Sequence, residues 1–179
     1  MRWPKSCPRF IPTRPVWCAA TSAPYGVGDL VADFALPALD GGQGRLSDCQ
    51  GKTVVLVFTA TWCPYCGAEA QSLEGISQRF KDRDVQMIVV DVKEDAATAA
   101  RFRDHHGWTY PVWLDQSGAL GLQFAPHKEG LPPEVAIINA HFILDGEGRV
   151  QYRDYLNMER FDARATAVVE ELERLVAPR

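Results

Sequence analysis

The sequence has little of what a membrane, nucleic-acid-binding or disulfide-scaffold protein needs. No stretch reaches the roughly 18 apolar residues of a membrane-spanning helix. Acidic residues are absent up to Gly28, where four basic ones occur, and the remainder has 15 basic and 23 acidic residues, a net charge of −8. This acidic body argues against nucleic acid as a partner. The five cysteines are too few for a disulfide framework, and their odd number leaves at least one unpaired.

The first 26 residues differ from the rest of the chain. They are rich in proline and have no hydrophobic periodicity, so we expect a flexible arm at 1–26 and one domain of ordinary size at 27–179. The prolines interrupt any apolar run as long as that of a signal peptide, so we expect no secretory signal. Cys7 and Cys18 lie in this arm and could pair in an oxidising compartment.

The first half of the domain has the pattern of a βαβ unit. Asp40-Gly-Gly42 separates two short apolar pieces and predicts a small leading hairpin. The continuous β-branched run at 53–59 predicts a central strand covered on both faces, and the run at 85–91 predicts a second buried strand. Between them, apolar residues from Cys66 to Phe80 recur at helical spacing and predict a helix.

The second half adds a helix, a strand, a hairpin and a closing helix. Asp95 can cap a helix that ends at Gly107, and residues 112–114 predict a short strand. Residues 142–153, with a glycine-containing turn, predict an edge hairpin. Apolar residues from Phe161 to Leu175 repeat at spacings of four and three and predict an amphipathic helix. The fold class is therefore α/β.

The pair Cys63 and Cys66 lies where the central strand passes into the helix. The first sulfur is then at the helix N-terminus, where unpaired N–H groups and the macrodipole stabilise an anion. Because such placement lowers a cysteine pKa from about 8.5 to roughly 3.5–7.5, we predict that Cys63 is the nucleophile. Cys66, one turn further, is predicted to resolve the mixed disulfide. Pro64 suits the first helical turn. The alternative, half of a zinc site, lacks a second pair of ligands at the required spacing.

The cysteine pair is one of several motifs that occur together. They are Gly28-Asp-Leu-Val-Ala-Asp-Phe34, Leu46-Ser-Asp48, Gly51-Lys52, Phe58-Thr-Ala-Thr-Trp-Cys-Pro-Tyr-Cys66 and Glu69. From about Gly28 to its end the chain resembles the TlpA/ResA group of thioredoxin-like proteins, which overlaps with the AhpC/TSA type. The resemblance implies a thioredoxin fold, with a central mixed sheet flanked by helices, an N-terminal β-hairpin and an inserted αβ unit. It also implies disulfide exchange with proteins.

The resemblance gives roles to residues around the cysteines. It places Glu69 at the acid position three residues after the second cysteine, where a carboxylate could carry the proton of Cys66; the alternative is an exposed helix residue. Trp62 would shield the nucleophile and shape the docking surface, or would simply pack there. We expect Cys63, Cys66 and Glu69 to be catalytic. The residues expected to contact substrate are Trp62, Pro64, Tyr65, Pro133 and Asn139.

Two positions depart from the thioredoxin pattern. Val57 stands where thioredoxins keep a buried aspartate, which leaves Glu69 as the one nearby proton carrier visible in the sequence. Asn139 stands three residues before Phe142, where the cis-proline that binds the substrate chain is expected. Either Pro133 takes the cis role in an inserted loop, or Asn139 replaces it with a trans peptide, since a cis bond at a non-proline residue is very costly. We favour Pro133, although an ordinary loop break there is the other interpretation.

Two other functions are compatible with the cysteine pair. Residues 28–34 and 145–148 also resemble peroxiredoxins, but that family has Thr or Ser three residues before its cysteine and Pro seven before, where this chain has Ala60 and Leu56. A copper-binding module of similar fold could use Cys63, Cys66 and His141, since two thiolates and an imidazole suit Cu(I).

The expected partners follow from disulfide exchange. They are protein thiols and disulfides, together with an upstream reductase or oxidase. We expect the protein itself to be a monomer. We expect no metal and no cofactor beyond the redox-active disulfide Cys63–Cys66. The family resemblance points to a place outside the cytoplasm, whereas the missing signal segment points inside.

Overall fold

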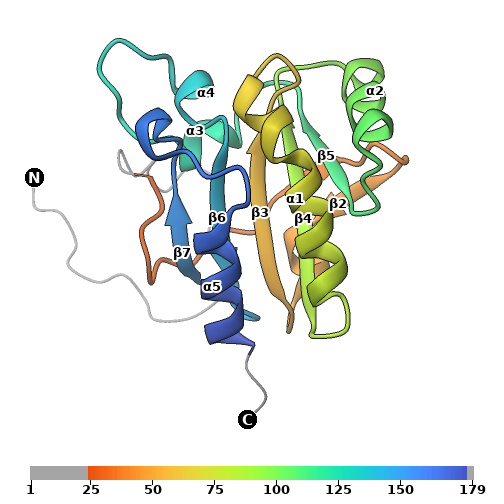
Figure 1. The fold of residues 1–179 in the computed structure, drawn as a ribbon, viewed down its shortest axis with the longest axis vertical. Helices are drawn as coiled ribbons and strands as arrows, with labels where there is room; N and C mark the ends of the chain where they lie inside the picture. The colour runs from red at the N-terminus through yellow and green to blue at the C-terminus, as the bar shows by residue number, and fades with distance from the viewer. Residues whose placement is uncertain (1–23, 177–179) are drawn as a thin grey trace, which may run out of the picture.

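Residues 24–176, the part that this computed structural model describes, form a five-stranded sheet with helices and a separate two-stranded hairpin (Figure 1). Most of the predicted arm, with Cys7 and Cys18, lies outside these residues. The elements are β1 Ala35–Pro37, β2 Gln43–Arg45, η1 Leu46–Cys49, β3 Thr53–Thr59, α1 Pro64–Phe80, β4 Val85–Val92, α2 Ala96–His106, β5 Val112–Asp115, α3 Gly121–Phe124, α4 Pro133–Ala136, β6 Ala140–Leu144, β7 Val150–Asp154, η2 Met158–Arg160 and α5 Thr166–Leu175.

The five-stranded sheet is mixed, with strand order β5-β4-β3-β6-β7. Strands β3, β4 and β5 are parallel to one another, β6 pairs antiparallel with β3, and β7 pairs antiparallel with β6. The β-branched run from Thr53 to Thr59 is the central strand, as predicted, and six of its seven residues are buried. Val57 is paired with Val89 on one side and with His141 on the other. The sheet therefore brings residues from β4 and β6 beside the strand that leads into the cysteines.

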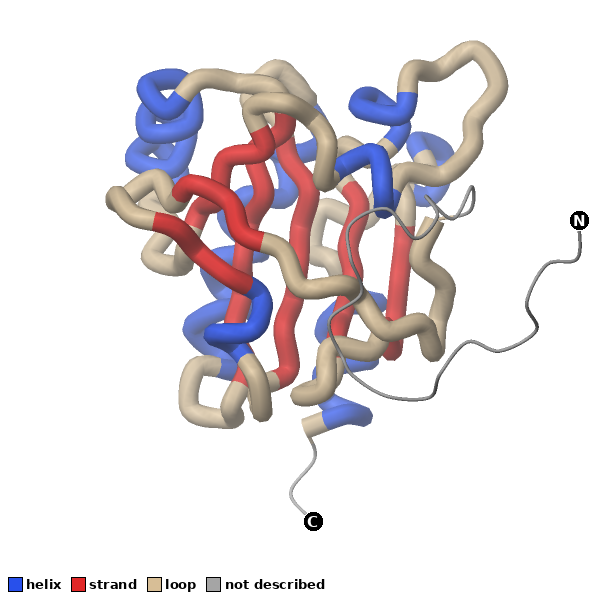
Figure 2. Tube along the Cα trace, turned by 180° about the vertical axis from the view of Figure 1, so that it is seen from behind, coloured by secondary structure: helices blue, strands red, loops and turns tan. Residues whose placement is uncertain are grey.

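Different elements cover the two faces of the sheet. Helices α1, α2 and α5 lie on one face (Figure 1), and the β1–β2 hairpin lies on the other (Figure 2). Because side chains alternate along a strand, Val55 and Val57 of β3 pack in the core under α1 and α5, and Leu56 and Phe58 pack in the core on the hairpin side. Both cores are continuous apolar clusters, as a sheet covered on both faces requires.

Helix α1 has the boundaries that its sequence predicts. Pro64 occupies the first helical position, where its missing N–H costs nothing. The buried residues of the helix recur at helical spacing and face the sheet, whereas the exposed face is polar. They are Cys66, Glu69, Ala70, Leu73, Ile76 and Phe80. Glu69 is thus on the buried face, and the interpretation of an exposed helix residue is wrong.

The closing helix begins later than the sequence predicts. Helix α5 starts at Thr166, and Phe161 lies before it, with its ring 4.9 Å from that of Tyr65. The carboxylate of Asp162 accepts hydrogen bonds from the backbone N–H groups of Arg164 and Thr166. These bonds hold a turn in which Ala165 has a φ of 48°, so the regular helix begins after it. The apolar spacing could not reveal this turn.

Within residues 24–176, no helix is both long enough and apolar enough to cross a membrane.

Candidate active site

Cys63 is the N-cap residue of α1, at the end of β3 that points to the top of Figure 1. Its Sγ accepts a hydrogen bond of 3.4 Å from the backbone N–H of Cys66. Only 4% of the Cys63 surface is exposed, but its neighbours Trp62 and Pro64 are exposed on both sides. The sulfur therefore lies just beneath the surface that these neighbours form, with its partner cysteine one turn into the helix.

The two thiols have opposite acidities. A hydrogen bond from the Cys66 thiol is the largest cause that lowers the pKa of Cys63, to about 6, with help from the backbone N–H groups of Cys66 and Tyr65 against the effect of burial. The same hydrogen bond, together with burial, raises the pKa of Cys66. Cys63 is therefore mostly a thiolate at neutral pH, and Cys66 keeps its proton.

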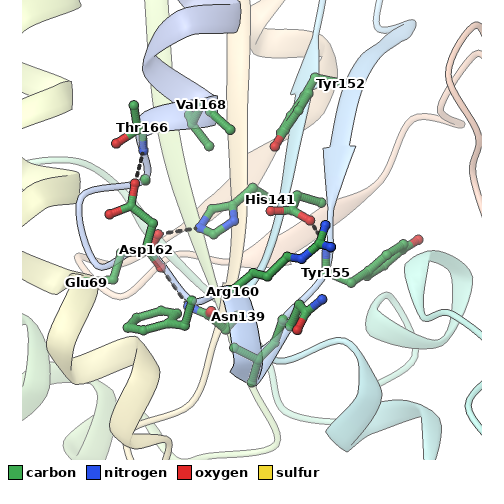
Figure 3. A pocket seen from close by; sticks show the side chains of 15 residues that line it. Glu69, Asn139, His141, Tyr152, Tyr155, Arg160, Asp162, Thr166 and Val168 are labelled. Carbon is green, nitrogen blue, oxygen red and sulfur yellow. Dashed lines mark hydrogen bonds and ion pairs between the residues drawn. The ribbon is translucent and has the colours of Figure 1, made fainter.

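Glu69 is buried and held by two side chains from the start of β6. It is 1% exposed. Nδ2 of Asn139 donates a hydrogen bond of 2.6 Å to its Oε2, and Nε2 of His141 lies 3.0 Å from its Oε1 without the alignment of a full hydrogen bond. Figure 3 shows the imidazole and the amide meeting the carboxylate from the same side. The negative charge of Glu69 also opposes the lowering of the Cys63 pKa, so the carboxylate is close enough to sense the cysteine pair.

Asn139 occupies the place directly before β6 with a trans peptide bond. Its φ is 61°, a left-handed conformation that asparagine tolerates better than most residues. Its backbone N–H donates to the carbonyl of Phe58, at 2.8 Å, and its side chain is turned inward to Glu69. The amide side chain is thus committed to the buried carboxylate.

The expected cis role of Pro133 is wrong. No peptide bond in residues 24–176 is cis. Pro133 is instead the first residue of the short helix α4, where its fixed φ is already helical. Of the two alternatives, the trans peptide at Asn139 describes the chain.

The other residues expected to contact substrate lie at the surface around Cys63. Trp62 is 58% exposed, and Pro64 is exposed as well. Tyr65 is half-buried against Phe161. Trp62 therefore presents an open apolar ring next to Cys63, and simple packing does not account for it.

Two acidic side chains at the end of β4 support the loop that carries the cysteines. Glu94 accepts hydrogen bonds from the backbone N–H and the hydroxyl of Thr61, at 2.6 and 2.7 Å. Asp91, at the end of β4, is buried beside Glu94 and is paired in the sheet with Thr59. Burial and the neighbouring charge of Glu94 raise the pKa of Asp91 to about 8.

The ligand set of the copper alternative is not assembled. Among residues 24–176 no three His, Cys, Asp or Glu side chains are arranged to hold a metal ion. His141, which that alternative requires, faces Glu69 instead.

Sequence reasoning missed His141, Asp91 and Glu94 as parts of this site. The sequence suggests His141 only as a metal ligand, because its contact with Glu69 joins positions 72 residues apart and no local pattern indicates it. Asp91 carried a usable signal: an acid that ends a buried apolar strand at 85–92 is expected near a functional site. Glu94 had no such signal.

With this geometry in view, comparison with known proteins identifies relatives of the chain. The family model described as AhpC/TSA family matches residues 27–153. The thiol-disulfide oxidoreductase ResA of Geobacillus kaustophilus is 34% identical over 90 residues, which cover 50% of this chain and 52% of that protein. ResA of Geobacillus thermodenitrificans is 32% identical over 125 residues, 70% of this chain and 67% of that protein. The chain thus spans about half to two thirds of the length of these relatives.

Solved structures show the same fold. A putative protein disulfide isomerase from Bacteroides thetaiotaomicron superposes with a TM-score of 0.67 at 27% identity, covering 86% of this chain and 92% of that one. Peroxidoxin BcpB from Mycobacterium tuberculosis superposes with a TM-score of 0.68 at 25% identity, covering 87% and 99%. These likenesses confirm the thioredoxin fold and the resemblance to the ResA group. The chain belongs to the AhpC/TSA family.

Proposed function

We propose that the protein is a thiol-disulfide oxidoreductase that exchanges disulfides with protein substrates. The observation that carries this proposal is the pair at the start of α1, in which Cys63 is an acidic thiol and Cys66 is a weakly acidic one. A thiolate is the nucleophile in disulfide exchange, and a protonated neighbour waits as the resolving group. The names of the ResA relatives agree with this chemistry.

The reaction needs two sulfur transfers. The thiolate of Cys63 attacks one sulfur of a substrate disulfide, forms a mixed disulfide and releases the other sulfur as a thiolate. Cys66 then loses its proton and attacks Sγ of Cys63. This second attack releases the reduced substrate and leaves a Cys63–Cys66 disulfide, so two electrons pass to the substrate. The reverse sequence oxidises a dithiol substrate.

Glu69 is proposed to accept the proton of Cys66 in the second step. It lies three residues after Cys66 on the same buried face of α1. Within the described residues of this region Val57 provides no carboxylate, and Asp91 is engaged with Glu94. A carboxylate held in a fixed position near the thiol is placed to act as a general base.

The redox-active disulfide is proposed as the one redox group of the reaction. It requires an upstream reductase or oxidase to reset it. Trp62, Pro64 and Tyr65 are proposed to contact the substrate chain, because they surround the sulfur at the surface.

The test is reduction of insulin disulfides in the presence of dithiothreitol. Cys63→Ser should lose the acceleration over dithiothreitol alone, because no thiolate remains at the helix N-terminus. Cys66→Ser should accumulate mixed disulfides that are visible on non-reducing gels. Undiminished insulin reduction by Cys63→Ser rules out the proposal.

A thiol peroxidase is the second candidate, and the similarity to peroxidoxin BcpB favours it. In that case Cys63 would react with hydrogen peroxide to give a sulfenic acid, which a thiol reduces. Rapid peroxide consumption by Cys66→Ser with an added thiol, together with weak insulin reduction by the wild type, would decide for this candidate.

A further inference from the structure

A cavity of about 290 Å³ lies beside Glu69, between β6, β7 and the segment that leads into α5. Its floor is buried and includes Glu69, Asn139 and His141. Its rim is exposed and includes Arg160 and Asp162. The cavity therefore opens to solvent, and it has room for several water molecules among polar groups.

This opening is separate from the surface around the nucleophile. Cys63, Trp62, Pro64 and Tyr65 are not among the residues that line the cavity. The ring of Tyr65 packs against Phe161, which does line it. A protein substrate seated over Cys63 would cover the first surface and leave the second open.

His141 is the titratable side chain that the structure places against the carboxylate of Glu69. The carboxylate is 1% exposed, so it does not meet bulk water directly. Its Oε2 is bound by the amide of Asn139, which does not titrate. Its Oε1 faces Nε2 of His141, and a neutral imidazole has one ring nitrogen that can accept a proton and another that can donate one. His141 is 6% exposed and lines the cavity, and its Nε2 has no fully formed hydrogen bond.

We propose that His141 relays the proton of the resolving cysteine from Glu69 to water in this cavity. This inference rests on the proposed disulfide exchange. One proton moves in each reductive turnover: from the Cys66 thiol to Glu69, from Glu69 to Nε2 of His141, and from the other ring nitrogen to cavity water. No electrons move in these steps. The relay lets the second sulfur transfer proceed while a substrate covers the surface around Cys63.

The experiment separates the two sulfur transfers with an aromatic disulfide, 5,5′-dithiobis(2-nitrobenzoate), added to the reduced protein in excess. Attack by Cys63 releases one coloured thiolate at a rate that rises with the reagent concentration. Attack by Cys66 on the mixed disulfide releases a second coloured thiolate, at a rate that does not depend on the reagent concentration. His141→Gln keeps a polar side chain but cannot relay a proton. We expect an unchanged first phase and a second phase slowed by about 10-fold or more.

Chemical rescue distinguishes a proton relay from a structural role. In His141→Ala, added imidazole should enter the cavity and accelerate the second phase in proportion to its concentration, with no effect on the first phase. His105→Gln is the matched control, because His105 is an exposed histidine at the end of α2, and both phases should match the wild type. Ala167→Trp, at the exposed rim, should slow the second phase without altering the buried floor.

The outcomes separate this inference from the proposed function. If the wild type shows no second phase that requires Cys66, disulfide exchange itself is contradicted. If the wild type shows both phases and the second is equally fast in His141→Gln and Ala167→Trp, the relay is contradicted and the exchange reaction stands. A slow second phase in His141→Ala that imidazole does not accelerate also overturns the relay.

Discussion

At the scale of single residues, one contact between two sulfurs gives chemically identical side chains different tasks. The hydrogen bond from Cys66 is the largest cause that lowers the pKa of Cys63, ahead of the backbone N–H groups at the start of α1. The helix terminus alone is therefore not the main source of the acidity. The thiol of Cys66 lowers the pKa of Cys63, and in the proposed exchange it later replaces the substrate on that sulfur.

The first prediction concerns this contact. Removing the donor in Cys66→Ala should raise the pKa of Cys63 from about 6 by about one pH unit or more, since a hydrogen bond to a charged group is worth roughly 1.5–3 kcal/mol. Cys66→Ser keeps an O–H donor, so the pKa of Cys63 should be lower in Cys66→Ser than in Cys66→Ala. Thiolate absorbance at 240 nm, titrated from pH 4 to 10, measures both.

Two comparisons make that titration decisive. Cys63→Ser with Cys66 present should show no absorbance step near pH 6, which assigns the step to Cys63. Equal pKa values for Cys63 in the alanine and serine variants would mean that the sulfur contact contributes little, and that the backbone N–H groups of α1 carry the acidity instead.

Some residues of the site are predictable from neighbouring sequence, and others depend on contacts between distant segments. The positions of Cys63, Pro64 and Cys66 at a helix start are predictable, because the strand and the following helix are both indicated by one continuous stretch, residues 53–80. The contacts of Glu69 with Asn139 and His141 join segments about 70 residues apart, and only the pairing of β3 with β6 brings them together. No periodicity in the sequence encodes that pairing.

At the scale of elements, the end of β4 supports the loop between β3 and α1. Glu94 binds both polar groups of Thr61, two residues before the nucleophile. Asp91 lies behind Glu94 in a buried place, where two negative carboxylates would repel. A proton retained on Asp91 removes this repulsion and leaves Glu94 free to hold the loop.

The second prediction follows from that proton. Because the pKa of Asp91 is about 8 in the folded protein and about 3.9 when unfolded, the folded state binds the additional proton between these values. The contribution of Asp91 to the free energy of unfolding should therefore fall as pH rises from about 4 to about 8. Asp91→Asn cannot ionise, so its stability should depend less on pH in this window, by on the order of a few kcal/mol.

Urea unfolding at pH 5 and pH 8 measures this difference. The control is Asp82→Asn, an exposed aspartate in the turn after α1, which should keep the slope of the wild type. An equal change between the two pH values in Asp91→Asn and in the wild type would show that Asp91 is not the group responsible.

Elements were predictable where the chain marks their ends. Asp95 accepts from the N–H of Thr98, and Gly107 has the left-handed φ of 66°, so α2 begins and ends as the sequence predicts. Helices α3 and α4 have four residues each, too few to show a period, so the sequence does not predict them. Helix α5 was predicted too long because the turn held by Asp162 interrupts an apolar spacing that continues through it.

At the scale of the whole molecule, the leading hairpin covers the sheet next to β5 on the face away from α1 (Figure 2). The N–H of Leu39 donates to the carbonyl of Val112, at 2.9 Å, and Ala38 forms a bridge with Trp113. Gly44 of β2 lies directly against the indole of Trp113, with no room for a Cβ atom. The absence of a side chain at Gly44 allows this close approach of hairpin and sheet.

The last prediction compares a glycine packed against a buried ring, Gly44, with an exposed glycine, Gly75. Gly44→Ala must displace the buried indole of Trp113, and overpacking of this kind costs about 1–3 kcal/mol, so the melting temperature should fall. Gly75→Ala adds a methyl group to the exposed face of α1, where nothing lies within 4 Å, and should raise stability by about 0.5–1 kcal/mol. Insulin reduction at 25 °C should be retained in both variants, because neither residue contacts the cysteine pair. If Gly44→Ala melts like the wild type, the hairpin does not hold its place against Trp113. If it instead loses exchange while still folded, the hairpin influences the site through the sheet.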